Sequence, residues 1–168
     1  AVNASLDVTL TNTTVADNAA LIGGGVSTFG AFSATNATFS GNAADISAGA
    51  VKAFDTITAT NSIFLGDTAV SAESELDGAS LIYQGLNIVG TGSDTDASDH
   101  VINAATIGTV LVTDLAAKAV LADNGGPVKT IALVDAAGNP ALDASNASGT
   151  ATDARGAAAF DRADVANT

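Results

Sequence analysis

The sequence predicts an all-β fold, a single-stranded parallel β-helix, from a recurring phrase and from an interior of small apolar residues. The phrase is NTTVADN at 12–18, NATFSGN at 36–42, NSIFLGD at 61–67 and, shortened, LNIVG at 86–90. The apolar residues at its centre are spaced by 24, 25 and 25 residues and are Val15, Phe39, Phe64 and Val89. Such a period is typical of solenoids, whose turns stack because one turn cannot bury its apolar face alone. We therefore expect about four coils of 24–25 residues.

The composition favours a thin, closely packed core. Apolar residues make up 47% of the 168 residues, yet aromatic residues only 4%, and the chain has 17 Gly. The apolar share excludes intrinsic disorder, and the lack of Cys excludes disulfides. No run of apolar residues is long enough to predict a segment that spans a bilayer.

Each coil is expected to begin with a strand that has one face inward. Leu6, Val8 and Leu10 alternate with polar residues, which is the period of a half-buried strand. The inward positions of the next two coils are then Phe32 and Ala34, followed by Ile57 and Ala59.

Asparagines open the recurring phrase where the strand should turn. Asn12, Asn36 and Asn61 occupy one equivalent position, so we predict a structural ladder of amide hydrogen bonds inside the solenoid. In the fourth coil, a spacing of 25 residues puts Leu86 in this position and a spacing of 26 puts Asn87 there. The sequence leaves these two registers open.

The period disappears after about residue 91. We assign residues 1–91 to β-helix coils and residues 92–168 to the last coil, loops and an irregular C-terminal cap of the same domain. A short helix is expected around Leu115 to Leu121, with Asp114 as its N-cap.

The charge balance is strongly acidic. Eighteen acidic against five basic residues give a net charge of −13, which argues against nucleic acid and anionic membrane surfaces as partners. Asp94, Asp96 and Asp99 place carboxylates at alternate positions of one loop and are candidate Ca²⁺ ligands; the alternative is a solvated loop. No other cofactor is predicted.

Three residues of the C-terminal half have candidate roles. Asp153 and Arg155 are expected to form a structural ion pair that holds the tail on the solenoid. His100, the only histidine, is expected at the surface, because no motif places a nucleophile beside it.

Several motifs resemble known families. GGGV and FSGN resemble repeats of polymorphic outer-membrane proteins, and NSIFLGD, GLNIVG, LADNGGPVKTIAL, GNPALDAS and TDARG are similar to bacterial choice-of-anchor Q domain proteins. The resemblance implies a right-handed β-helix on a secreted or surface-displayed protein. It also implies that LADNGGP ends the helix, that TDARG folds back over it, and that a terminal strand is missing after Thr168. Asp67 stands where the family pattern has Asn.

These observations predict a non-enzymatic extracellular structural or adhesive module of a bacterial surface protein. The expected partners are copies of itself, stacked end to end into a fibre, and a surface glycan or a host or cell ligand. The alternative is a carbohydrate-active enzyme, a polysaccharide lyase or glycoside hydrolase, which requires accessible carboxyl groups on one groove. Asp17 and Asp67 lie near equivalent corners, but Gly41 or Asn42 intervenes, and the chain has no Trp and one Tyr for stacking on sugars.

Overall fold

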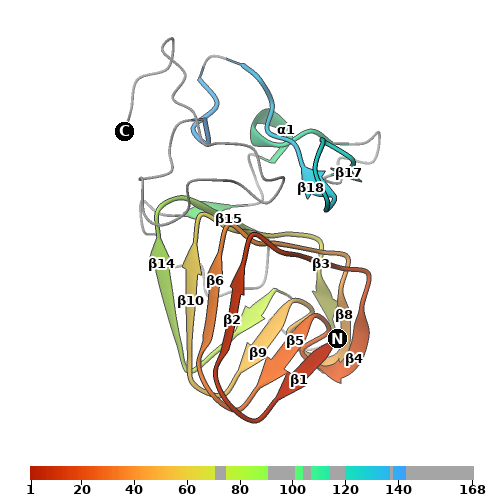
Figure 1. The fold of residues 1–168 in the computed structure, drawn as a ribbon, viewed down its shortest axis with the longest axis vertical. Coiled ribbons are helices and arrows are strands. Elements are labelled where there is room, and N and C mark those ends of the chain that lie inside the picture. Colours follow the sequence, from red (N-terminus) through yellow and green to blue (C-terminus); the bar gives the residue numbers. More distant parts are fainter. Residues whose placement is uncertain (71–74, 91–100, 104–106, 114–119, 137, 143–168) are drawn as a thin grey trace.

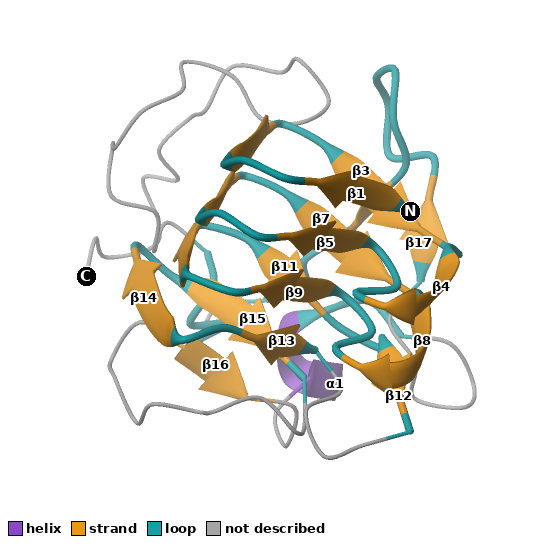
Figure 2. Ribbon diagram, turned by 90° about the horizontal axis from the view of Figure 1, so that it is seen from below, coloured by secondary structure: helices purple, strands orange, loops and turns teal. Residues whose placement is uncertain are grey.

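Short strands in each coil pair in parallel with strands one coil earlier and later, which makes the chain a parallel β-solenoid of about four turns (Figures 1 and 2). The computed structural model describes residues 1–70, 75–90, 101–103, 107–113, 120–136 and 138–142. The first coil contains β1 (Val2–Ala4), β2 (Val8–Thr11), β3 (Thr14–Ala16) and β4 (Ala19–Ile22). The second contains β5 (Val26–Thr28), β6 (Phe32–Thr35), β7 (Thr38–Ser40) and β8 (Ala43–Ser47). The third contains β9 (Val51–Ala53), β10 (Thr56–Thr60), β11 (Ile63–Phe64) and β12 (Thr68–Ala69).

The fourth coil contains β13 (Leu76–Asp77), β14 (Ser80–Gln84) and β15 (Asn87–Val89), and β16 (Val101–Asn103) adds a further parallel strand beside β15. The coils therefore build four parallel sheets, in the orders β1-β5-β9-β13, β2-β6-β10-β14, β3-β7-β11-β15-β16 and β4-β8-β12. Figure 2 shows the rungs of the first sheet stacked directly above one another.

The register confirms the inward positions predicted for the second and third coils. Phe32 pairs with Val8 on one side and with Ile57 on the other, and Ala34 likewise lies between Leu10 and Ala59. The prediction for Leu6 is wrong, because its side chain is 78% exposed. The chain bends at this residue before β2 begins, so the alternation that turns Val8 inward does not extend back to it.

Several corners of the coils contain a residue in the left-handed backbone region. The corner after the β2-type strands has Asn12 (φ 52°), Asn36 (φ 51°), Asn61 (φ 48°) and, in the fourth coil, Gly85 (φ 60°). Glycine adopts this conformation freely, and Asn is among the few other residues that tolerate it. Neither Leu86 nor Asn87 takes the turn position. Gln84 pairs with Thr60, and Ile88 pairs with Ile63. The fourth coil therefore has one more residue between Gln84 and Ile88 than the third coil has between Thr60 and Ile63.

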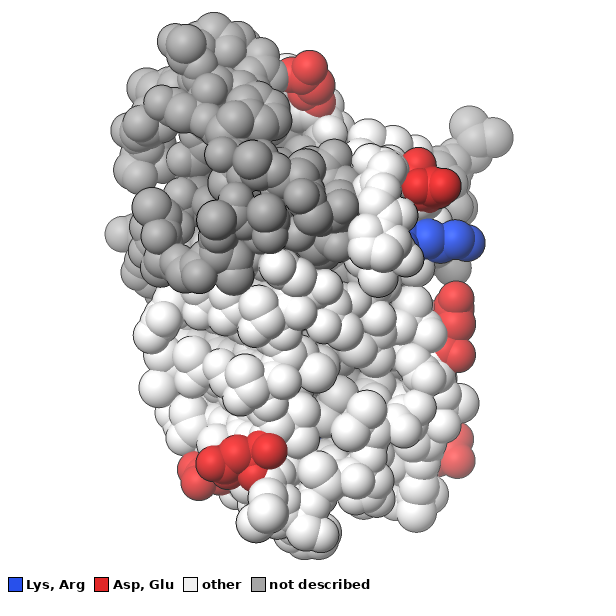
Figure 3. Space-filling view, viewed as in Figure 1, with Lys and Arg blue, Asp and Glu red and all other residues white. Residues whose placement is uncertain are grey.

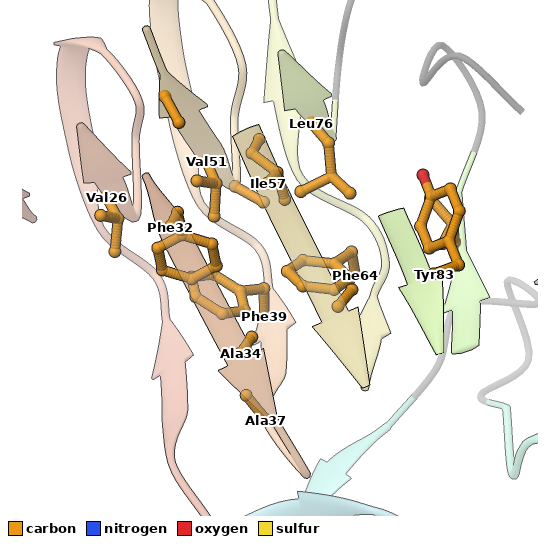
Figure 4. Packing of buried hydrophobic residues seen from close by; sticks show 14 residues of the cluster. Val26, Phe32, Ala34, Ala37, Phe39, Val51, Ile57, Phe64, Leu76 and Tyr83 are labelled. Carbon is orange, nitrogen blue, oxygen red and sulfur yellow. The ribbon is translucent and has the colours of Figure 1, made fainter. Parts of the chain in front are cut away.

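Phenylalanines fill the centre of the solenoid (Figure 4). The Phe39 ring stacks on Phe64 with centroids 5.0 Å apart, and Phe32 meets Phe39 edge to face at 6.0 Å. All three side chains are buried, and Val51 and Ile57 pack in the same cluster. Because successive coils place Phe39 and Phe64 in one column, two rings stack at the centre of a chain that has few aromatic residues.

A second apolar cluster covers the outer side of the β3-β7-β11-β15-β16 sheet. A helical turn, α1 (Ile107–Val110), and an antiparallel pair, β17 (Leu121–Ala122) and β18 (Thr130–Ile131), lie beyond β15 in Figure 1. The cluster consists of Leu65, Ile88, Val110, Leu111 and Ile131, with Ile63, Leu121 and Ala141 packed against it. The chain here forms the irregular cap that its loss of period predicts.

The helix predicted around 115–121 lies mostly outside the described residues, but its last residue, Leu121, is in β17, so the prediction is wrong there. Leu121 belongs to a strand because it pairs with Ile131 and packs on the solenoid flank. Within the described ranges, no helix is long and apolar enough to cross a membrane.

Replacing Phe39 tests the ring stack. We expect Phe39→Ala to lower the free energy of unfolding by about 3–5 kcal/mol, because it leaves a cavity between two coils. Phe29→Ala is the control, since Phe29 is 66% exposed and its loss opens no cavity. Equal losses of unfolding free energy in the two variants, measured by urea-induced unfolding, would contradict the described core.

Candidate functional site

Several predicted site residues lie outside the residues that the structure describes. These are the Ca²⁺ candidates Asp94, Asp96 and Asp99, the ion pair Asp153 and Arg155, and His100. Within the described part of the chain, no group of three or more His, Cys, Asp or Glu side chains is placed to hold a metal ion.

The predicted asparagine ladder lies at a corner that is half-buried. Asn36 Nδ2 donates a hydrogen bond to Asn12 Oδ1 at 3.2 Å. Asn61 Oδ1 accepts one from the backbone N–H of Leu86, also at 3.2 Å. All three asparagines are only partly buried, in contrast to the interior position that we expected. Their shared feature is the left-handed turn, which directs the side chains toward neighbouring corners.

A second polar column is buried at two of its three positions, and it uses the last residue of the recurring phrase. Asn18, Asn42 and Asp67 follow one another at spacings of 24 and 25 residues. Asn18 Nδ2 donates to Asn42 Oδ1 at 3.0 Å, and Asn42 donates to Asp67 Oδ1 through both its backbone N–H and its Nδ2, each at 2.7 Å. Asn42 is completely buried and Asp67 is 3% exposed. Sequence reasoning missed this column although its signal, Asn-Asn-Asp at equivalent positions, is present.

Glu75 ends the interior column with a second buried carboxyl group. Its Oε1 accepts the backbone N–H of Gly66 at 3.0 Å and its Oε2 accepts that of Asp67 at 3.3 Å. A Cβ at position 90 would lie 2.0 Å from Glu75 Oε1, so Gly90 is required for the carboxyl group to fit. Glu75 is 2% exposed, and Asp67 Oδ2 accepts no N–H or hydroxyl hydrogen bond from the described residues.

The two carboxyl groups hold a proton at neutral pH. Burial raises the pKa of Glu75 to about 9, and the nearby charge of Asp67 adds to this shift. Burial also raises the pKa of Asp67 to about 6, while hydrogen bonds from Glu75 and Asn42 oppose the increase. Glu75 is therefore the protonated partner, and its O–H donates toward Asp67.

Asp17 belongs to a different column from Asp67. Its position is equivalent to those of Gly41 and Gly66, which all have positive φ at the second corner of the coil. Asp17 Oδ1 lies close over Gly41, where an added Cβ would be 2.7 Å away. Asp17 and Asp67 are thus one residue apart in the repeat and do not occupy equivalent positions. The carboxyl group beside Asp67 is that of Glu75.

An exposed aromatic corner lies where β5 and β9 turn toward β6 and β10; we define it as Phe29, Phe54, Lys52 and Asp77. Phe29 and Phe54 are stacked with ring centroids 4.9 Å apart and planes 13° from parallel. Their side chains are nevertheless 66% and 51% exposed. The sequence analysis did not predict this pair, although Phe29 and Phe54 are 25 residues apart, which is the spacing of one coil.

A charged pair flanks the exposed rings. Lys52 Nζ lies 5.1 Å from the centroid of Phe54 and 2.7 Å from Asp77 Oδ2. Ser47 Oγ also donates to Asp77 Oδ2. Partial burial alone would raise the pKa of Asp77, but the hydrogen bonds from Lys52 and Ser47 hold it below its usual value. The corner thus combines an apolar surface with fixed donor and acceptor groups.

Comparison of the chain with protein-family models, with curated proteins and with solved structures finds no match in any of the three. The resemblance to polymorphic outer-membrane and choice-of-anchor Q proteins therefore stays a prediction, and function is argued from the geometry alone.

The carboxyl pair predicts a stability that depends on pH. Both pKa values are higher in the folded chain than in model peptides, so the folded state binds more protons above pH 4. Stability from this pair is therefore complete at acidic pH and is lost as the pH rises through about 6 and then about 9. Glu75→Gln should flatten the fall in melting temperature between pH 6 and 9, because the amide donates to Asp67 without titrating.

Asp45→Asn, on the exposed surface of β8, is the matched control for that experiment. It removes one carboxyl group from the acidic surface and should leave the difference between the pH 6 and pH 9 melting temperatures unchanged. An unaltered pH profile in Glu75→Gln would contradict the shared proton.

Proposed function

We propose that this chain is a non-enzymatic, extracellular structural and adhesive module of a bacterial surface protein, and that it makes contact through its aromatic corner. The observation that carries the proposal is the exposed Phe29–Phe54 stack, held in place by the register of two coils. The backbone N–H of Phe29 donates to Ala4 O and that of Phe54 to Thr28 O, so the backbone of both residues is held to the neighbouring coil.

The energetics of the corner favour a partner. Fully burying a Phe side chain contributes about 1.5–3 kcal/mol, and most of this gain is unused while the rings face water. A surface glycan or a cell-surface protein that covers both rings gains this free energy of burial. The adjacent Lys52–Asp77 pair then supplies directional hydrogen bonds that distinguish one ligand from another.

The enclosed position of the carboxyl pair supports a non-enzymatic role. A glycosidase needs two carboxyl groups on either side of a bound sugar. Asp67 and Glu75 are almost fully buried, and Asn42, Gly66 and Gly90 surround them. These side chains account for the pair as an interior stabilising group, so the enzyme alternative has no specific observation in its favour.

The proposal includes association through a solenoid end. In the first coil, Val8, Leu10 and Val15 are only partly buried, whereas their equivalents in the second coil are buried. Unpaired strand edges of this kind are templates for further strands. Light scattering on the full chain should show a mass that increases with concentration, and a monomer mass at every concentration would contradict end-to-end stacking.

Adhesion is tested with protein-coated beads on bacterial cells and on immobilised glycans. We expect Phe29→Ser combined with Phe54→Ser to abolish attachment, because both apolar surfaces are removed. Leu21→Ser is the matched control, since Leu21 is 61% exposed on β4, away from the corner. Attachment that survives the double substitution, or release of sugar by the unmodified protein, would refute the proposed role.

A further inference from the structure

The outer side of the β2-β6-β10-β14 sheet carries an ordered array of hydroxyl groups. In β2, β6 and β10 the inward positions are apolar, so the alternate positions lie on the outer side, although Thr60 at the end of β10 is itself buried. Strand register stacks these outward residues into two rows along the solenoid axis. We call this surface the hydroxyl face; its rows are Thr9, Ser33 and Thr58, and Thr11, Thr35 and Thr60.

Most of these hydroxyl groups are free to bind water. Thr60 Oγ1 lies 3.5 Å from Gln84 Oε1, but the other five hydroxyls have no hydrogen bond to any described residue. Thr9 and Thr11 are exposed, Ser33, Thr35 and Thr58 are partly exposed, and Thr60 is buried, with 7% exposed. An array of unpaired donors and acceptors on a regular sheet fixes the positions of the water molecules that it binds.

The hydroxyl face is also free of charge. Both rows contain only Thr and Ser, in a chain whose net charge is −13. Figure 3 shows the acidic side chains toward the margins of the view, with uncharged residues over β2, β6 and β10. A charged side chain would impose its own hydration shell, so its absence from these rows lets the bound water follow the sheet's repeat.

The array repeats in two directions at spacings fixed by β geometry. Rungs are about 4.8 Å apart, and alternate residues in one strand are about 6.7 Å apart. These distances are close to the oxygen repeats on the prism faces of hexagonal ice.

We propose that the hydroxyl face binds ice, with water ordered on the two rows joining the crystal lattice. The inference goes beyond the proposed function, because it needs neither the aromatic corner nor display on a cell. A dissolved ligand would require a concave site or charged and aromatic side chains, whereas a flat neutral array matches a flat crystal surface. A second copy of the chain is the competing occupant.

The fourth coil marks the limit of the array. Ile82 continues the row of Thr58, and Gln84 continues the row of Thr60. Both residues are exposed but break the repeat of hydroxyl groups. Changing both to Thr extends the array by one rung and should therefore strengthen ice binding.

The test measures thermal hysteresis and inhibition of ice recrystallisation with the full chain. We expect the unmodified protein to separate its melting and freezing temperatures. Thr35→Lys, at the centre of the array, should abolish this gap. Asn3→Lys places the same charge on the outer side of β1 and should retain it, and Ile82→Thr with Gln84→Thr should widen it.

Circular dichroism melting of each variant shows whether it has folded. A hysteresis no greater than that of serum albumin at equal concentration would overturn the inference, as would full activity in folded Thr35→Lys. Loss of a dimer in Thr35→Lys without any ice activity would also overturn it and would assign the face to self-association. Adhesion of coated beads to cells is measured separately, so failure here leaves the proposed function standing.

Discussion

The parallel register between coils is the constraint on which every other feature depends. Hydrogen bonds from one rung to the next keep residues 24 or 25 positions apart directly above one another. A side chain in this solenoid therefore lies beside the side chains that occupy the same position in the coils before and after it. Aromatic rings consequently stack on aromatic rings, and side-chain amides form hydrogen bonds with one another. Hydroxyl groups on the outer side of a sheet likewise form rows.

The same constraint explains the carboxyl pair. Asp67 continues an amide column, but an aspartate cannot donate the hydrogen bond that an asparagine gives to the next coil. The chain meets this need with Glu75, whose proton replaces the missing N–H, and with Gly90, which leaves room for the carboxyl group. The change from Asn to Asp is thus accommodated locally, without disturbing the strands on either side.

Much of the fold was predictable, because periodicity records the register directly: Phe32, Ala34, Ile57 and Ala59 lie where the repeat places them. Leu6 was not, because alternation does not reveal where a strand begins. The role of the turn asparagines was only partly visible, since their backbone conformation, and not burial, distinguishes them. Glu75 could not be found from sequence, because it joins the column from outside the repeated phrase, through a contact with Asp67 in three dimensions.

The corner residues have a consequence for how such a chain changes its length. In the first three coils the corners after the β2-type and β3-type strands each contain one residue with positive φ, and the fourth coil accepts an added residue beside Gly85 while its strands stay paired. Added residues are thus accommodated both at a vertex and within a side, because the β4–β8 register shifts between Ala20 and Ile22. Duplication of a whole coil would lengthen every surface row by one unit at once, so the strength of any multivalent contact could be adjusted in discrete genetic steps.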